Sequence, residues 1–400
     1  MNIKLSSNME CFQRGEEFLK VLHYIKDNSA PDYKLFSFNS SYYYNLTNLL
    51  EPIARQIKED CRTVVMVGMG GAILNPKTFA LFNRNADLNI EYLDTLDPIY
   101  FQSFIKRIEL KQTKFLIISK SGETLETISL CLTLIKIFEQ QGIKNINKHF
   151  IFITGFKDST LKEIAINLGS TILPHEEIGG RFASFTNINL LPLMLMNQDA
   201  HAFCEGGEEV LRDFLYNREE SLIAKGMPFL TNMVENKYSI HINMSYAKSL
   251  HNFLEWNKQI IAESLGKEGF GITPMCAHGP EDQHSQLQLY LDGSKDKFFS
   301  LYNFAIYKAP NLPAVEFQGI FNKTIEDLIL AQYKAFVDIL SEHKIPTRQI
   351  TMLDDSAKSL GALMMFSMIE TIVLGLMNNI NPFGQPAVEG MKQLVYKLLK

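Results

Sequence analysis

The chain has 400 residues, and 39 basic against 44 acidic side chains give it a net charge of −5. A general nucleic-acid binder needs an excess of Lys and Arg to neutralise phosphates, so this balance argues against nucleic acid as a partner. With 46% hydrophobic and 21% charged residues, the chain can bury sizeable cores. A chain of this length is too long for one ordinary hydrophobic core, so we predict two domains of roughly 150–200 residues each.

The cysteine pattern indicates a reducing, cytoplasmic location. The five cysteines are an odd number. Because they lie far apart and contain no CxxC pair, neither a disulfide framework nor a zinc site is expected. Residues 1–20 alternate polar and apolar side chains and lack the apolar block of a signal peptide.

The predicted elements are short apolar strands separated by helix-length segments. Residues 1–45 are expected to be an N-terminal helical segment that packs on the first domain. Strands are then predicted for a run that begins at Thr63 and for Ile90–Asp94, Lys114–Gly122, His149–Gly155 and Ser170–Pro174. A looser repeat follows at Tyr238–Ser245, Phe298–Tyr307 and Arg348–Asp354. This alternation predicts parallel sheets covered by helices on both faces, with the polar stretch Asn197–Lys237 as the crossover between two α/β domains.

One segment, residues 360–380, is long and apolar enough to cross a bilayer. Glu370 lies at its centre, however, and a charge at the bilayer midplane is costly and rare. We therefore predict a buried helix rather than a membrane span.

Two predicted turns lie where parallel strands end, which is the edge at which such sheets bind ligands. The first contains Gly70 and Gly71, whose bare backbone would let N–H groups approach an anion at a helix N-terminus. A tight turn with no ligand is the alternative. A dinucleotide site is disfavoured, because Ile73 stands where the GxGxxG pattern needs its third glycine.

The second turn carries hydroxyl groups and a lysine at the start of a predicted helix, namely Ser119, Lys120, Ser121 and Thr124. Taken alone, Ser121 is better explained as a helix N-cap. Two anion-friendly loops on one sheet edge nevertheless favour a single bound phosphate monoester.

Glu263 is the candidate general base. It lies in a predicted helix that ends at Gly266 and shares an apolar stripe with Trp256 and Ile260. Burial there should raise the pKa of its carboxyl and suit it to proton transfer near neutral pH. A glutamate at the edge of the stripe that reaches solvent is the alternative.

His284 opens another predicted helix, where the positive helix end favours the neutral imidazole and hence acid–base work. A purely structural histidine in the first turn is the commoner case. His278 lies six residues earlier, but no third ligand of convincing spacing is nearby, so no metal site is expected.

Three further polar residues are candidates for the same site. Arg181 follows two glycines at the mouth of an apolar segment, so it either holds an anion or extends into solvent. Gln385 and Lys392 are seven residues apart, on one face of a C-terminal helix. A structural lysine whose stem packs on that face is the default explanation for Lys392.

Six segments in order resemble the phosphoglucose isomerase family, which is built from two sugar-isomerase (SIS) domains. They are GMGGAILNP, SKSGETLET, EIGGRF, AESLGK, DQHSQLQLY and NPFGQPAVEGMK. The resemblance runs from about Thr63 to Lys392. It implies an α/β fold of two SIS-type doubly wound domains with mainly parallel sheets flanked by helices, at residues 46–200 and 201–400.

The resemblance also implies the roles of the site residues. The sugar phosphate would be bound by Ser119, Lys120, Ser121 and Thr124, with Gly70 and Gly71 near the sugar ring. Glu263 would move a proton between C1 and C2, and Arg181 would stabilise the cis-enediol intermediate. His284 would assist ring opening, and Lys392 with Gln385 would line the site. In this family the histidine comes from the partner subunit, so the resemblance implies a homodimer with shared active sites. It also implies that the reaction uses no cofactor.

The expected activity is therefore glucose-6-phosphate isomerase, an aldose–ketose isomerase that interconverts glucose 6-phosphate and fructose 6-phosphate. The alternatives are a catalytically inactive SIS-type regulator that binds sugar phosphate and a dual phosphoglucose/phosphomannose isomerase. Ala72 and Ala183 stand where the family usually has serines. Losing one hydrogen bond at Ala72 should cost about 0.5–1.5 kcal/mol, mainly in substrate binding.

Overall fold

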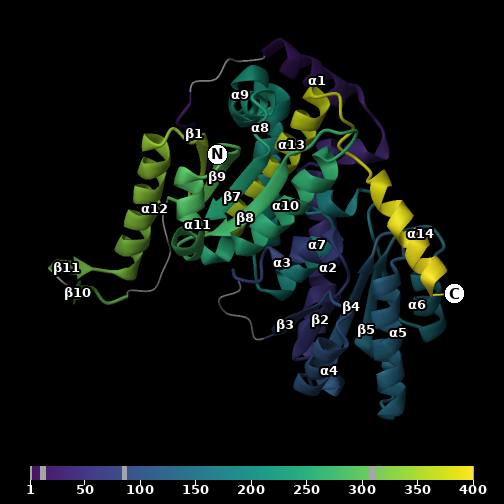
Figure 1. Ribbon diagram of the computed structural model, residues 1–400. Coiled ribbons are helices and arrows are strands. Elements are labelled where there is room, and N and C mark those ends of the chain that lie inside the picture. The colour runs from purple at the N-terminus through teal and green to yellow at the C-terminus, as the bar shows by residue number, and fades with distance from the viewer. Residues whose placement is uncertain (1, 10–14, 83–87, 306–311, 318, 400) are drawn as a thin grey trace.

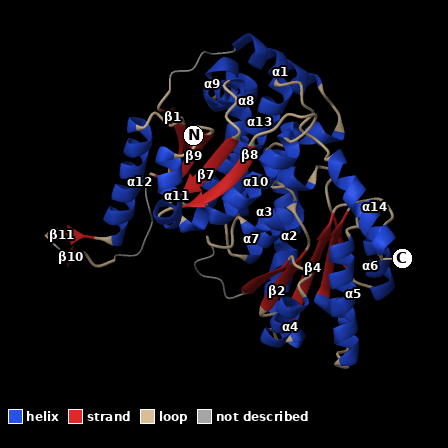
Figure 2. Cartoon of the chain, in the orientation of Figure 1, coloured by secondary structure: helices blue, strands red, loops and turns tan. Residues whose placement is uncertain are grey.

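The structure, a computed structural model, describes residues 2–9, 15–82, 88–305, 312–317 and 319–399. Two five-stranded sheets form its centre, and helices surround each of them (Figure 2). The predicted fold class, α/β with mainly parallel sheets flanked by helices, is confirmed. Cys11 and the predicted end of a strand at Tyr307 lie outside the described residues.

The first sheet is parallel throughout. Its order is β3 (Asn89–Leu93), β2 (Thr63–Val67), β4 (Thr113–Ser119), β5 (Phe150–Thr154) and β6 (Thr171–Pro174). Val64 and Met66 face one buried cluster, whereas Val65 and Val67 face another. Burial on both faces explains why β2 is apolar at nearly every position. Since Val67 lies opposite Ile117, the turns after β2 and β4 meet at one edge.

The helices around this sheet come from the first half of the chain. They are α2 (Ser40–Asp60), α3 (Gly71–Lys77), α4 (Pro98–Arg107), α5 (Leu125–Gln140), α6 (Thr160–Leu168) and α7 (Asn187–Leu195). Buried side chains of α4, α5 and α6 pack on one face of the sheet, and those of α2 and α7 share the cluster on the other. The sheet is therefore enclosed between two helical layers.

The second sheet has one antiparallel edge strand, β1, and three parallel pairs. Its order is β1 (Ile3–Ser7), β12 (Thr347–Met352), β9 (Lys297–Phe304), β7 (Ile240–Ser245) and β8 (Thr273–His278). Its helices are α1 (Gly15–Asp27), α8 (Ala200–Asn217), α9 (Leu222–Glu235), α10 (His251–Leu265), α11 (Glu281–Asp292), α12 (Ile325–Glu342) and α13 (Ala357–Met377).

The N-terminal expectation is wrong at its start. Residues 3–7 form a strand that pairs with β12 of the second sheet, although helices packed on the first domain were expected. Strand β8 was also missed. Pro274 interrupts its sequence, and proline within a strand is tolerated chiefly at an edge, which is where β8 lies.

Two elements project from this body. The antiparallel hairpin of β10 (Val315–Phe317) and β11 (Ile320–Lys323) extends with α12 away from the second sheet (Figure 1). Val315, Ile325 and Leu328 are exposed on this arm. At the other end of the chain, α14 (Glu389–Leu398) has no buried residue.

The apolar segment around Glu370 is helix α13, and 89% of its most apolar window is buried inside the protein. Glu370 accepts two hydrogen bonds from Arg348 of β12, at 2.5 Å (Nη1 to Oε1) and 2.7 Å (Nη2 to Oε2). Both side chains are buried. The charge that argued against a membrane span is thus neutralised by a partner from the sheet.

Removing one partner of this pair should leave an uncompensated buried charge. We expect Glu370→Gln to lower the free energy of unfolding by about 3–5 kcal/mol. Urea denaturation measures this change. The double variant Arg348→Met/Glu370→Leu should recover most of the lost free energy of unfolding, because it removes both charges. If the free energy of unfolding of Glu370→Gln stays within about 0.5 kcal/mol of wild type, as for a surface substitution, the pairing is contradicted.

Candidate active site

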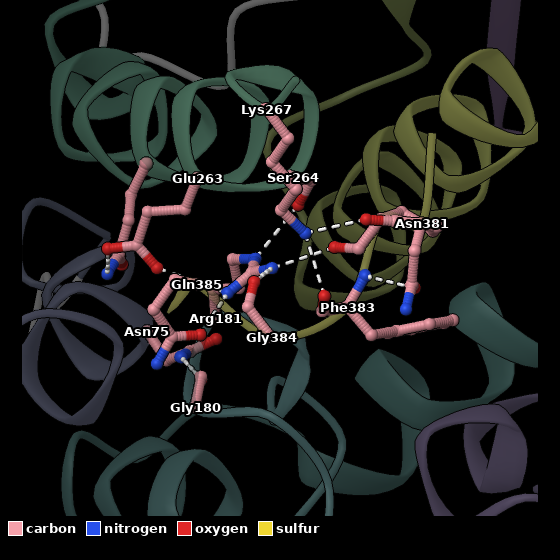
Figure 3. Close-up of polar contacts among 12 residues, drawn as sticks. Asn75, Gly180, Arg181, Glu263, Ser264, Lys267, Asn381, Phe383, Gly384 and Gln385 are labelled. Atoms are coloured by element: carbon pink, nitrogen blue, oxygen red, sulfur yellow. Dashed lines mark hydrogen bonds and ion pairs between the residues drawn. The ribbon is translucent and has the colours of Figure 1, made fainter. Parts of the chain in front are cut away.

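The polar residues of the site come from four places that are distant in sequence. They are the N-terminus of α3, the short 3-10 helix Gly180–Phe182, the C-terminal end of α10 and the segment 381–385 after α13 (Figure 3). The predicted residues Arg181, Glu263 and Gln385 meet there.

Arg181 is the centre of the site and is only 3% exposed. Its Nε donates to Ser264 Oγ at 2.8 Å, and its Nη1 to Glu263 Oε2 and Gln385 Oε1 at 3.1 and 3.2 Å. Its Nη2 donates to the carbonyls of Pro382 and Gly384 at 2.7 and 3.0 Å. These contacts engage all five N–H groups of the guanidinium. Burial lowers the pKa of Arg181 and the Glu263 carboxylate opposes that effect, so the side chain stays charged.

Glu263 lies two residues before the end of α10, which Gly266 terminates as predicted. Its Oε1 accepts a hydrogen bond from Gln259 Nε2 at 2.9 Å, and its Oε2 accepts the one from Arg181. The side chain is 34% exposed. Two donors therefore fix the orientation of a carboxylate that solvent can still reach.

The glycine turn after β2 lies directly against the Arg181 backbone. A Cβ at Gly71 would lie 2.5 Å from the carbonyl carbon of Gly180 and 2.6 Å from the nitrogen of Arg181, so only glycine fits. Gly70, the N-cap of α3, lies beside Gln259. Both predicted glycines are therefore in the same site as Glu263 and Arg181.

Asn75 holds this close approach together. Its Nδ2 donates to the carbonyls of Gly71 and Gly180, at 2.5 and 2.9 Å. Its Oδ1 accepts from Ser184 Oγ at 2.6 Å and from Trp256 Nε1 at 3.0 Å. Both donors and both acceptor positions of this buried amide are satisfied.

The Ser119–Thr124 loop follows β4 and precedes α5, as predicted. Ser119 Oγ lies 2.9 Å from Thr124 Oγ1 and accepts the Gly122 N–H. The N-cap of α5 is Thr124, whose side chain makes no capping hydrogen bond. The alternative that Ser121 is the N-cap is therefore wrong, since its Oγ accepts instead from the Glu123 N–H at 3.2 Å.

Lys120 connects this loop to the segment that leads to Arg181. Its Nζ donates to the carbonyl of Glu177 at 3.1 Å, and burial lowers its pKa. The Ser119–Thr124 loop and Arg181 are thus joined by the short stretch of backbone from Glu177 to Arg181.

Two predicted residues are not brought to this cluster. His284 is exposed on α11, and its imidazole has no hydrogen-bond partner among the described residues. Lys392 is 58% exposed on α14, where its Nζ donates to Glu389 at 2.6 Å. Within the described part of one chain, neither contacts Arg181 or Glu263.

Four residues of the site were missed as individual contributors, namely Asn75, Gln259, Ser264 and Lys267. Asn75, Ser264 and Lys267 occur in the quoted segments GMGGAILNP and AESLGK, but no spacing rule distinguishes them from ordinary helix residues. Asn75 and Lys267 donate to backbone carbonyls, and Ser264 accepts a hydrogen bond from the distant Arg181 side chain.

Among the described residues, no three His, Cys, Asp or Glu side chains lie so that they could hold a metal ion. What the site offers is a carboxylate and a guanidinium 3.1 Å apart. The hydroxyl-rich Ser119–Thr124 loop precedes α5 and is linked through Lys120 to the carbonyl of Glu177. A carboxylate that can take a proton, beside a cation that can stabilise negative charge, is typical of enzymes that move a proton next to a carbonyl group.

Comparison with known proteins agrees with that class. The sequence profile described as phosphoglucose isomerase matches residues 54–274. Glucose-6-phosphate isomerase of Methanocaldococcus jannaschii is 34% identical over 351 residues, which are 84% of each chain. The chain therefore belongs to the phosphoglucose isomerase family.

Solved structures show the same fold. A hypothetical protein from Thermus thermophilus matches with a TM-score of 0.88 at 26% identity, over 96% of this chain and 94% of that one. A glucose-6-phosphate isomerase from Chlamydia trachomatis matches with a TM-score of 0.80 at 18% identity, over 96% and 78%.

Asn75→Asp tests the amide that holds the glycine turn against Arg181. The change keeps the shape but places an acceptor oxygen against the Gly71 and Gly180 carbonyls, so we expect a loss of about 2–4 kcal/mol in unfolding free energy. Urea denaturation followed by Trp256 fluorescence measures it. Asn236→Asp, on the surface, is the control, and equal effects of the two variants would contradict the assignment.

Proposed function

We propose that this chain interconverts glucose 6-phosphate and fructose 6-phosphate. Family membership and relatives that carry this name support the proposal. The observation that carries it is the contact of Arg181 with Glu263, at 3.1 Å, in a site that also contains Gln385.

The phosphate would bind at the start of α5. Backbone N–H groups there point out of the helix N-terminus, and the hydroxyls of Ser119 and Thr124 are close together at 2.9 Å. Lys120 adds a positive charge beside the loop. These groups would anchor the substrate and leave its carbonyl end directed to the glycine turn and Glu263.

Glu263 would take the proton from C2 of the open-chain aldose and return it to C1. Negative charge then develops on the oxygens of the cis-enediol, and the nearby guanidinium of Arg181 would stabilise it by Coulomb attraction. Because all five Arg181 N–H groups are engaged, the guanidinium is already oriented before the reaction begins. No metal or organic cofactor is needed for these steps.

A homodimer would complete the site. His284 is exposed on α11, which suits a residue that serves the neighbouring subunit in ring opening. The arm formed by α12 and the β10–β11 hairpin exposes apolar side chains that a second copy could cover. Gln385 and Lys392 would line the same site from the C-terminal segment.

We place the enzyme in the cytoplasm, without nucleic acid or membrane partners. Four described cysteines, Cys61, Cys131, Cys204 and Cys276, are free thiols. Unpaired cysteines are typical of a reducing compartment, which supports this location.

Glu263→Gln tests the base. Loss of a positioned general base should reduce kcat by about 10²–10⁴-fold, while the phosphate loop keeps KM nearly unchanged. A coupled assay of fructose 6-phosphate conversion measures both constants, with Glu255→Gln on the same helix as control. Full activity of Glu263→Gln would refute the base assignment.

The same assay on the wild type tests the alternative functions. Binding of sugar phosphate without turnover by the wild type would favour the regulator, and turnover of mannose 6-phosphate would indicate dual specificity.

Mixing two inactive variants tests the shared site. If each site takes Glu263 from one subunit and His284 from the other, a heterodimer of Glu263→Gln and His284→Ala contains one intact site. Random reassembly should then restore about a quarter of the wild-type activity. Mixing Glu263→Gln with Glu263→Ala is the control. No recovery from a proven mixture of subunits would exclude a shared site.

A further inference from the structure

Lys267 makes a pair of contacts that the proposed reaction does not use. Its Nζ donates to the carbonyl of Asn381 at 2.6 Å and to that of Phe383 at 2.7 Å. Arg181 takes the alternate carbonyls, those of Pro382 and Gly384. Four successive carbonyls of one segment therefore face two cations (Figure 3).

The chain after this segment leads to the predicted C-terminal site residues. Gly384 has a φ of +67°, a left-handed conformation that suits glycine and turns the chain after the last bound carbonyl. Gln385 follows and accepts a hydrogen bond from Arg181. The position of Gln385 is thus set by the residues immediately before it.

Apolar packing also supports the segment, because Pro382 and Phe383 are both buried. Phe383 is 6% exposed, and its ring contacts Phe182 and Tyr33 with ring centres 5.4 and 4.8 Å apart. Beyond it, the residues from Gly384 to Leu394 are all exposed. The carbonyl contacts with Lys267 and Arg181 are therefore the polar part of the attachment of the chain end.

We propose that Lys267 is a positioning residue that, together with Arg181, holds the carbonyls of residues 381–384 and so fixes Gln385 in the active site. We call this arrangement the carbonyl clasp. Its effect on catalysis rests on the proposed function, whereas its effect on the attachment of the C-terminal segment does not. Lys267 acts only through backbone and touches no reacting atom.

The Phe383–Gly384 peptide bond gives a direct readout, because its carbonyl is the one that Lys267 binds. Chymotrypsin cleaves after phenylalanine, and it can cut here only when the segment detaches. When opening is fast relative to cleavage, the cleavage rate reports the population of the detached form. Mass spectrometry identifies the product by a new N-terminus at Gly384.

Lys267→Met should raise this cleavage rate at least about tenfold, since two hydrogen bonds to a charged donor are lost. Lys267→Arg keeps the charge and the donors, and should return the rate to near the wild-type value. Lys258→Met, which removes a lysine that pairs with Glu255 on the same helix, is the matched control. Assays are made at pH 7, because burial and the charge of Arg181 lower the pKa of Lys267 to about 8.

An unchanged cleavage rate in Lys267→Met would overturn the proposal, and so would an equal rise in Lys258→Met. Lys267→Gln, whose shorter side chain keeps an N–H donor group without the charge, provides a second variant with an expected intermediate rate if Lys267→Met does not fold.

Activity provides the second readout. Lys267→Met should lower kcat about tenfold or more with a smaller change in KM, because the phosphate loop is untouched, and Lys267→Arg should restore it. A rise in KM alone would overturn the positioning role. If the wild type lacks isomerase activity, the proposed function fails, while the cleavage result still decides whether the clasp exists.

Discussion

The site depends on one buried guanidinium whose every donor must find a partner. Arg181 lies in a 3-10 helix of three residues, yet its acceptors are 82 to 204 positions away along the chain. An unmatched charge at 3% exposure would be costly, so α10 and the segment 381–385 must both be in place when Arg181 is buried. Folding of the two sheets and formation of the site are therefore coupled through this side chain.

A close backbone approach provides the second constraint. Gly71 contacts the Gly180 backbone without room for a side chain, and Asn75 satisfies both carbonyls at that point. The same amide accepts a hydrogen bond from Trp256, seven residues before Glu263 on α10. The helix that carries the Glu263 carboxylate is thus aligned with the glycine turn after β2.

The positions of individual charged residues matter more for binding an anion than the net charge of the chain. A chain with a net charge of −5 is not an obvious receptor for an anionic substrate. Lys120, Arg181 and Lys267 nevertheless lie around the site, where backbone carbonyls and one carboxylate hold them. Elsewhere, the buried Arg348–Glu370 ion pair joins α13 to β12, and Arg348 also donates to Ser300 of β9.

The sequence by itself determined the α/β class, the first sheet's strands and the two turns at its edge, because continuous apolar runs and glycine turns depend on local chemistry and on burial of both sheet faces. It also identified Arg181, Glu263 and Gln385, which lie in recognisable segments. Strands β1 and β8 were missed, because most side chains of β1 are polar and Pro274 interrupts β8. Only the tertiary structure decided that Asn75, Ser264 and Lys267 contact the site and that, within the described part of one chain, neither His284 nor Lys392 contacts Arg181 or Glu263. Contacts with distant backbone carbonyls leave no periodicity in the sequence, because any residue can supply the carbonyl.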